Sequence, residues 1–171
     1  IDNENIEGVE VSSQLWDLRR LFRAVSSGAN REPIRIEFAR LGGEPPRCIV
    51  ASPPDSGYRC LLTLLPGSAL VAMYRLYGPR LLERNVRSFL QLRGKVNQGI
   101  RKTIIEEPQM FLAFNNGLSV TASGLTLEDH GDGTATLLSA EDFQIVNGGQ
   151  TTGSIFRAWR KDKINADLLQ I

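Results

Sequence analysis

Apolar residues recur every three to four positions in four parts of the chain, a spacing that places them on one face of a helix. Proline suits the first position of a helix and glycine the position after its end, so these residues set several boundaries. The predicted helices run from Ser12 or Ser13 to Gly28, from Pro66 to about Tyr77, from Lys95 to about Glu106, and over about 149–161.

Strands are predicted between these helices, where short apolar runs occur or apolar and polar residues alternate. Gly131-Asp132-Gly133 is typical of a hairpin turn, whereas 81–90 fits either a strand or an extended segment. This order of elements predicts an α/β fold, α+β by stricter usage, with a mixed β-sheet and helices packed on at least one face. The predicted strands cover 34–38, 47–51, 58–64, 111–114, 118–127, 134–139 and 143–146.

The strand predicted at 143–146 ends in a glycine-containing turn that opens directly into the last helix. Two glycines, Gly148 and Gly149, follow Asn147 there, and Gln150 and Thr151 come next. Glycine permits positive φ and lets the backbone approach a ligand closely. Because the first amides of a helix lack internal partners and carry partial positive charge, this turn can hold an anion. The alternative is that the glycines only form a strand-to-helix corner.

A second polar turn, Asn115-Asn116-Gly117, separates the strands predicted at 111–114 and 118–127. A plain hairpin explains this turn equally well, because an Asn-Gly pair favours positive φ. Asn, Gln and Thr side chains can also bind phosphates, amides and bases through uncharged hydrogen bonds. We therefore expect the two turns to come together and form one ligand-binding site.

The net charge of +1 is small, but seven basic residues and a single acid lie between Arg80 and Lys102. Within this segment Arg84 and Arg87 stand three residues apart. Guanidinium groups can bind phosphates through two parallel hydrogen bonds, so the segment favours a nucleotide or nucleic acid as partner. The alternative is a solvated helix face whose charges pair with nearby acids.

Other chemical motifs are sparse in this sequence. No Walker lysine follows the glycines, and His130 lies in a polar turn. Two cysteines and one histidine are too few for a zinc site, so no metal site is predicted. Cys48 and Cys60 flank a turn, which allows either a disulfide across a hairpin or two free thiols in a reducing cytoplasm. No apolar run reaches the roughly 20 residues that span a bilayer, so we expect a cytoplasmic protein without a membrane partner.

Four sequence blocks, at 84–90, 96–100, 114–118 and 145–151, together resemble the AIPR family, the abortive infection phage resistance proteins of bacteria. The resemblance covers residues 58–171, where it implies an AIPR-like α/β domain. Residues 1–57 carry no matching block and are expected to hold a helix and strands of the same fragment or of a preceding region. AIPR proteins are longer than this chain, which also lacks an initiator Met, so we expect a fragment truncated at the C-terminus.

The order of helix, strands, glycine turn and helix is also similar to the core of the ParB and sulfiredoxin fold. In that fold a glycine-containing motif at a helix start holds nucleotide phosphates. The ParB motif continues with a basic pair, whereas Gln150 and Thr151 occupy those positions here. This departure argues against carrying over nucleotide hydrolysis.

The resemblance implies a role in antiphage defence, and the turns predict that the segment binds a phosphate-bearing ligand, a nucleotide or a nucleic acid. Two alternatives stay open: a nuclease acting on DNA or RNA, and a non-catalytic sensor or interaction module that recognises a phage component. The sequence predicts no catalytic residue, cofactor or oligomeric state. The predicted ligand-binding residues are Asn115, Asn116, Gly117, Asn147, Gly148, Gly149, Gln150, Thr151, Arg84 and Arg87.

Overall fold

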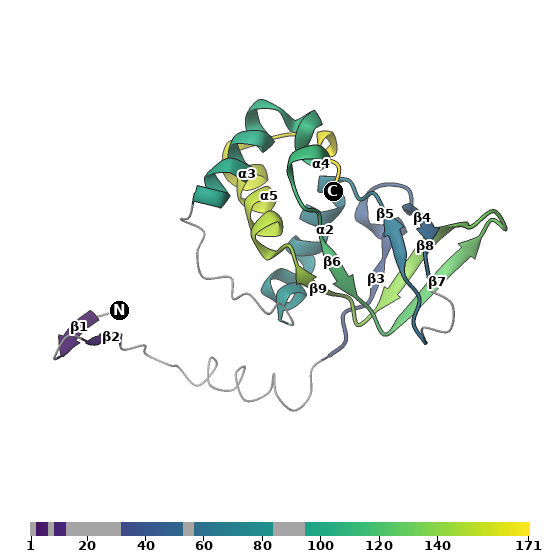
Figure 1. Ribbon diagram of the computed structural model, residues 1–171, viewed down its shortest axis with the longest axis horizontal. Helices are drawn as coiled ribbons and strands as arrows, with labels where there is room; N and C mark the ends of the chain where they lie inside the picture. Colours follow the sequence, from purple (N-terminus) through teal and green to yellow (C-terminus); the bar gives the residue numbers. More distant parts are fainter. Residues whose placement is uncertain (1–2, 7–8, 13–31, 53–56, 84–94) are drawn as a thin grey trace. The chain divides into compact units, whose positions relative to one another are not determined.

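The chain forms two units, Ile1–Glu32 and Pro33–Ile171. The computed structural model describes residues 3–6, 9–12, 32–52, 57–83 and 95–171 of them (Figure 1). In the first unit β1 (Asn3–Ile6) and β2 (Val9–Ser12) form an antiparallel pair. Ser12, one of the two expected helix caps, is therefore the last residue of a strand. The remainder of the helix predicted up to Gly28 lies outside the described residues.

The second unit is built on a sheet with β8 (Thr134–Glu141) at its centre. On one side β8 pairs with β7 (Gly124–Asp129), and on the other with β3 (Ile36–Glu37) and β4 (Arg47–Val50). Beyond β4 lies β5 (Leu61–Thr63), the edge strand. Every pair between described strands is antiparallel. The mixed α/β fold is confirmed, but the expected mixture of parallel and antiparallel strands was wrong.

The hairpin of β7 and β8 continues into a second antiparallel pair, β6 (Ser119–Thr121) and β9 (Gln144–Asn147). The ribbon bends between the two pairs, where the amide of Ser123 donates to the carbonyl of Glu141 (2.8 Å) and Asp142 has a φ of 49°. The single strand predicted at 118–127 is therefore two strands separated by this bend. The hairpin turn predicted at 131–133 is confirmed, and it joins β7 to β8.

Helices form where apolar periodicity predicted them: α2 (Gly67–Tyr77), α3 (Lys95–Glu106) and α5 (Gly149–Asp162). Figure 1 shows them gathered beside the sheet, and α5 contacts both α2 and α3. Ile104 of α3 and Ile155 of α5 are fully buried, which fixes the faces that these helices turn inward. Short 3-10 helices connect the described elements: η1 (Phe38–Leu41), η2 (Gly78–Leu82), η3 (Pro108–Met110) and η4 (Ala166–Leu168).

The apolar run at 111–114 forms a short helix, α4 (Phe111–Phe114), so the strand predicted there was wrong. Only Phe111 is buried, whereas a half-buried strand would bury every second residue. Asn115 ends this helix by a double contact with the carbonyl of Phe111. Its backbone amide donates to that oxygen at 3.1 Å and its side-chain Nδ2 at 3.0 Å.

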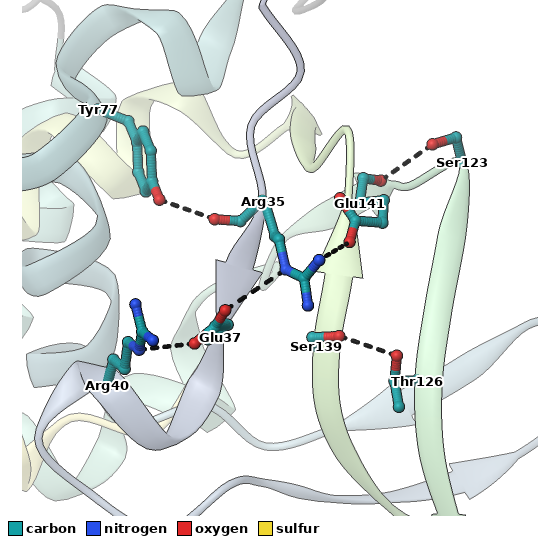
Figure 2. A network of polar contacts seen from close by, with 8 residues as sticks. All are labelled: Arg35, Glu37, Arg40, Tyr77, Ser123, Thr126, Ser139 and Glu141. Carbon is teal, nitrogen blue, oxygen red and sulfur yellow. Dashed lines mark hydrogen bonds and ion pairs between the residues drawn. The ribbon is translucent and has the colours of Figure 1, made fainter.

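Polar side chains hold β3 against its neighbours (Figure 2). The hydroxyl of Tyr77, at the end of α2, donates to the carbonyl of Arg35 (2.7 Å). The guanidinium of Arg35 pairs with Glu141 of β8 (3.0 Å), and Arg40 pairs with Glu37 (2.6 Å). These ion pairs are partly exposed and stabilise the fold by only about 0.2–1 kcal/mol each. Their effect is to fix the path of the chain as it leaves β3.

The strands β4 and β5 pair as predicted, but their register keeps the two thiols apart. Cys48 lies opposite Thr63, whereas the carbonyl of Cys60 accepts a hydrogen bond from the amide of Ala51 (2.9 Å). Both cysteines are free, so the alternative of two thiols is the one that holds. Cys48 is buried and donates to the carbonyl of Ala135 (3.3 Å); burial raises the pKa of its thiol.

The last residues of the chain pair with the segment between β5 and α2. Leu65 and Ile171 exchange two backbone hydrogen bonds, at 2.9 and 3.0 Å, and the amide of Gly67 donates to the carbonyl of Leu169 (2.9 Å). A Cβ atom on Gly67 would lie 2.7 Å from the carbonyl oxygen of Ala166. The first residue of α2 is therefore glycine because backbone passes directly against it.

Candidate ligand-binding turns

The pairing of β6 with β9 brings the two predicted turns together. Ser119 begins β6 and lies opposite Asn147, which ends β9. The chain therefore enters β6 and leaves β9 at the same end of the ribbon, as Figure 1 shows. A Cβ atom on Gly148 would lie 3.0 Å from the carbonyl oxygen of Gly117 and would overlap the side chain of Leu118. The expected convergence of the two turns is found in the structure.

Gly148 is the residue that makes this approach feasible. It precedes α5 as its N-cap residue with φ 99° and ψ 17°, in the left-handed region that favours glycine. Of the two glycines predicted to supply a positive φ, only this one has it, because Gly149 is already the first helical residue. Glycine is therefore needed at position 148 for two reasons. One is the positive φ, and the other is the contact with Gly117 and Leu118, which leaves no room for a Cβ atom.

The start of α5 presents unpartnered backbone amides. The amide of Gly148 is held by the side-chain oxygen of Asn147 (2.9 Å), and the carbonyl of Gly148 accepts from both the amide and the hydroxyl of Thr152 (2.9 and 3.0 Å). Within the described part of the chain, the next three amides, at 149–151, have no acceptor. No side chain caps the helix and no acidic residue stands in its first turn, so the partial positive charge there is uncompensated.

The polar side chains of the turns differ in how much they are committed to the fold. Asn115 uses its Nδ2 to cap α4, and Asn147 uses its oxygen on the neighbouring amide. Asn116 and Gln150 are exposed. Thr151 is only 7% exposed, and its hydroxyl contacts no hydrogen-bonding partner among the described residues. Asn116 and Gln150 are therefore the side chains best placed to meet a ligand from solvent.

Arg84 and Arg87 lie outside the described residues, so their predicted role stays a prediction. Two other basic residues of the segment from Arg80 to Lys102 form ion pairs with acidic residues, as the alternative interpretation of this segment predicted. Arg101 donates two hydrogen bonds to Asp162 (3.1 and 2.7 Å), and Lys102 lies 3.8 Å from Glu106. These ion pairs belong to α3 and α5.

The other features considered in the sequence are the possible metal ligands, His130 and apolar segments. In those residues no group of three or more His, Cys, Asp and Glu side chains could hold a metal ion. His130 sits at the β7–β8 hairpin with its Nε2 2.9 Å from the hydroxyl of Thr136. None of the helices that the structure describes has the length and apolar composition needed to cross a membrane.

Two residues beside the turns, Phe114 and Leu118, were not among the predicted ligand-binding residues. Leu118 packs on Gly148, and Phe114, the residue before Asn115, is 60% exposed. Their apolar character suggested strand interiors, whereas Phe114 lies on the exposed side of the short helix α4.

These features define an α+β protein in which an antiparallel ribbon delivers two glycine-containing turns to the start of one helix. Residues 82–171 match the family described as AIPR protein. The chain belongs to the AIPR family, as the four sequence blocks predicted, and this membership indicates an antiphage, abortive-infection role. No curated protein and no solved structure matches the chain. The similarity to the ParB and sulfiredoxin core and the domain boundary near residue 57 remain predictions.

Proposed function

We propose that this AIPR protein binds a phosphate-bearing ligand, a nucleotide or a nucleic acid, at the two paired turns. The observation that carries the proposal is the set of amides at 149–151, which lack acceptors among the described residues at the N-terminus of a fourteen-residue helix. Backbone amides in this position are suited to a phosphate because they donate hydrogen bonds and the helix dipole favours negative charge. A cytoplasmic location belongs to the same proposal.

The surroundings of these amides support an anionic ligand. The absence of acidic residues from the first turn of α5 leaves nothing there to repel a phosphate. Gly148 itself adds no side chain at the corner, where the carbonyl of Gly117 and the side chain of Leu118 lie against it. Asn116 and Gln150 add exposed amide groups that donate and accept hydrogen bonds.

Phe114 favours a ligand that carries a base as well as a phosphate. It is exposed and directly precedes the polar turn, so its ring is available in the same neighbourhood. Stacking of a base on an aromatic side chain contributes roughly 1–3 kcal/mol. A nucleotide or nucleic acid would use both the amides and the ring, whereas inorganic phosphate would use only the amides.

The substitution Gln150→Glu tests the proposal because it separates stability from binding. A carboxylate in the first turn of α5 interacts favourably with the helix dipole, so it should stabilise the fold by about 0.3–1 kcal/mol. The same charge repels a phosphate and should weaken nucleotide or nucleic-acid binding about tenfold, or roughly 1.4 kcal/mol. Gln170→Glu, a change at another exposed glutamine in the C-terminal segment, is the matched control and should leave binding unaltered.

Binding is measured by titration with nucleotides and with short single- and double-stranded oligonucleotides. Unchanged affinity of Gln150→Glu would contradict the proposal. The same samples, incubated with divalent metal ions and analysed for cleavage, test the nuclease alternative. If none of the anionic probes binds, the alternative of a non-catalytic sensor or interaction module would be favoured.

Arg84 and Arg87 are proposed to contribute to the same ligand. Replacing both with Gln should leave the melting temperature nearly unchanged, since exposed arginine ion pairs contribute only about 0.2–1 kcal/mol. The double variant should weaken nucleic-acid binding and flatten its salt dependence by about one unit of slope per lost phosphate contact. A large fall in melting temperature with unaltered binding would make these arginines structural.

A further inference from the structure

Each of the two turns contains an asparagine that is followed directly by glycine. Asn116-Gly117 lies between α4 and β6, and Asn147-Gly148 lies between β9 and α5. An asparagine in this position can lose its side-chain amide to attack by the next backbone nitrogen, and glycine has no side chain that would hinder the attack. Both asparagines are exposed. Sequence and exposure therefore give the two pairs the same reactivity, and any difference between them comes from the fold.

The fold leaves the Asn116-Gly117 pair free to react. Among the residues that the structure describes, neither the carboxamide of Asn116 nor the backbone amide of Gly117 has a hydrogen-bond partner. Nothing lies within 4 Å of a Cβ position on Gly117. The neighbouring Asn115, by contrast, uses its Nδ2 to cap α4 and is not followed by glycine. The side chain of Asn116 can therefore turn onto the nitrogen of Gly117.

The Asn147-Gly148 pair is held in a geometry that opposes the same reaction. The amide of Gly148 donates to the side-chain oxygen of Asn147 (2.9 Å). An N–H bond lies in the plane of its peptide, whereas the electrons with which the nitrogen attacks project out of that plane. An amide that directs its N–H at the carboxamide therefore directs these electrons elsewhere.

The contacts on either side prevent this peptide from turning. Asn147 pairs with Ser119 across the ribbon, and the carbonyl of Gly148 accepts two hydrogen bonds from Thr152, at 2.9 and 3.0 Å. A Cβ atom on Gly148 would lie 3.0 Å from the carbonyl oxygen of Gly117, so the glycine is also enclosed on that side.

We propose that Asn116 is a site of spontaneous deamidation and that the fold protects Asn147. The nitrogen of Gly117 loses its proton to solvent base and bonds to Cγ of Asn116. The bond from Cγ to Nδ2 then breaks, and ammonia leaves with a proton from solvent. Water opens the resulting cyclic imide at either of its two carbonyl carbons. The products are aspartate and isoaspartate, in which the main chain runs through the former side chain.

The reaction places a negative charge on the ligand-binding turns. Residue 116 precedes Gly117, whose carbonyl lies against the corner that begins α5. A carboxylate here repels a phosphate at the first amides of α5 and should weaken its binding by about threefold to tenfold. This effect on binding rests on the function proposed for the turns, whereas the modification itself does not.

Ageing of the full chain at mildly alkaline pH, folded and in urea, tests the proposal by peptide mapping with mass spectrometry. In the folded protein Asn116 should deamidate at least about tenfold faster than Asn147, a difference of roughly 1.4 kcal/mol in barrier. In urea the two residues should react at similar rates, because only the fold distinguishes them. Fragmentation should show isoaspartate as well as aspartate at position 116, since the imide opens in both directions.

Two variants connect the modification to binding. Asn116→Gln keeps the carboxamide but would have to close a larger ring, so its nucleotide binding should survive ageing. Asn116→Asp should bind as weakly as aged wild type from the start. Equal rates at Asn116 and Asn147 in the folded protein, or aspartate without isoaspartate at position 116, would overturn the proposal. If the fresh protein binds no nucleotide or oligonucleotide, the proposed function fails, and the deamidation rates still decide whether Asn116 is the modified residue.

Discussion

Replacing Gly148 by alanine should destabilise the fold by two separate effects. At φ 99° an L-residue enters the left-handed region, which costs roughly 1–2 kcal/mol. The new Cβ atom would also overlap the side chain of Leu118 and lie 3.0 Å from the carbonyl oxygen of Gly117. Overpacking of this kind costs roughly 1–3 kcal/mol. We expect a total loss of about 2–4 kcal/mol, since the Leu118 side chain can shift in part.

Gly133→Ala separates the two effects. Gly133, in the β7–β8 hairpin, has a φ of 83° but nothing within 4 Å of its Cβ position. This control should therefore lose only the conformational part, roughly 1–2 kcal/mol. The difference between the two variants measures the contact between the turns.

The assay is urea unfolding of wild type and both variants, followed by circular dichroism, with melting curves alongside. In a protein of this size each kcal/mol lowers the melting temperature by roughly 2–4 °C. Shortening Leu118 to alanine in the Gly148→Ala background should recover part of the loss, a coupling of about 0.5–3 kcal/mol. Equal destabilisation by Gly148→Ala and Gly133→Ala, together with no coupling to Leu118, would refute the juxtaposition of the turns.

Two further predictions concern the ion pair on α5 and the thiols. The hydrogen bond from Arg101 lowers the pKa of the Asp162 carboxyl in the folded protein. The ion pair therefore stabilises the fold at pH values above the unfolded-state pKa of Asp162, and this stabilisation is lost as the pH falls through the folded-state pKa. Asp162→Asn should thus flatten the acid side of the stability–pH curve, measured by denaturant unfolding down to about pH 3. In the native protein an alkylating reagent should label Cys60 well before the buried Cys48, whereas in denaturant both should be labelled at equal rates. The labelling rates are measured by mass spectrometry, and equal rates in the native protein would contradict the fold.

The helices α2 and α3 were predictable because a helix places apolar residues with this spacing on one face, whereas a strand does not. The pattern placed α3 over Lys95–Glu106 and ended α2 at Tyr77. The four-residue run at 111–114 was not predictable, because so short an apolar segment fits a buried strand or a helical turn equally. This segment forms a helix that Asn115 caps by donating a hydrogen bond to the carbonyl of Phe111, and the apolar pattern does not encode this contact.

The candidate site was predictable in composition and less so in geometry. The two polar turns followed from their Asn and Gly residues, and their convergence follows from the pairing of β6 with β9. The sequence could not tell which glycine takes the positive φ, because that depends on where α5 begins, at Gly149. The strand register that separates Cys48 from Cys60 was likewise beyond reach, since a hairpin loop of undetermined length fixes it.

The central claim is that the first amides of α5 hold a phosphate. Two-dimensional NMR of the isotope-labelled protein, titrated with a nucleotide, tests it most directly. The account predicts saturable shifts of the amide signals of Gly149, Gln150 and Thr151, with smaller shifts at Asn116 and Gly117, and their loss in Gln150→Glu. Shifts confined to residues elsewhere in the chain, or no saturable shift at these amides with any nucleotide or oligonucleotide, would contradict it.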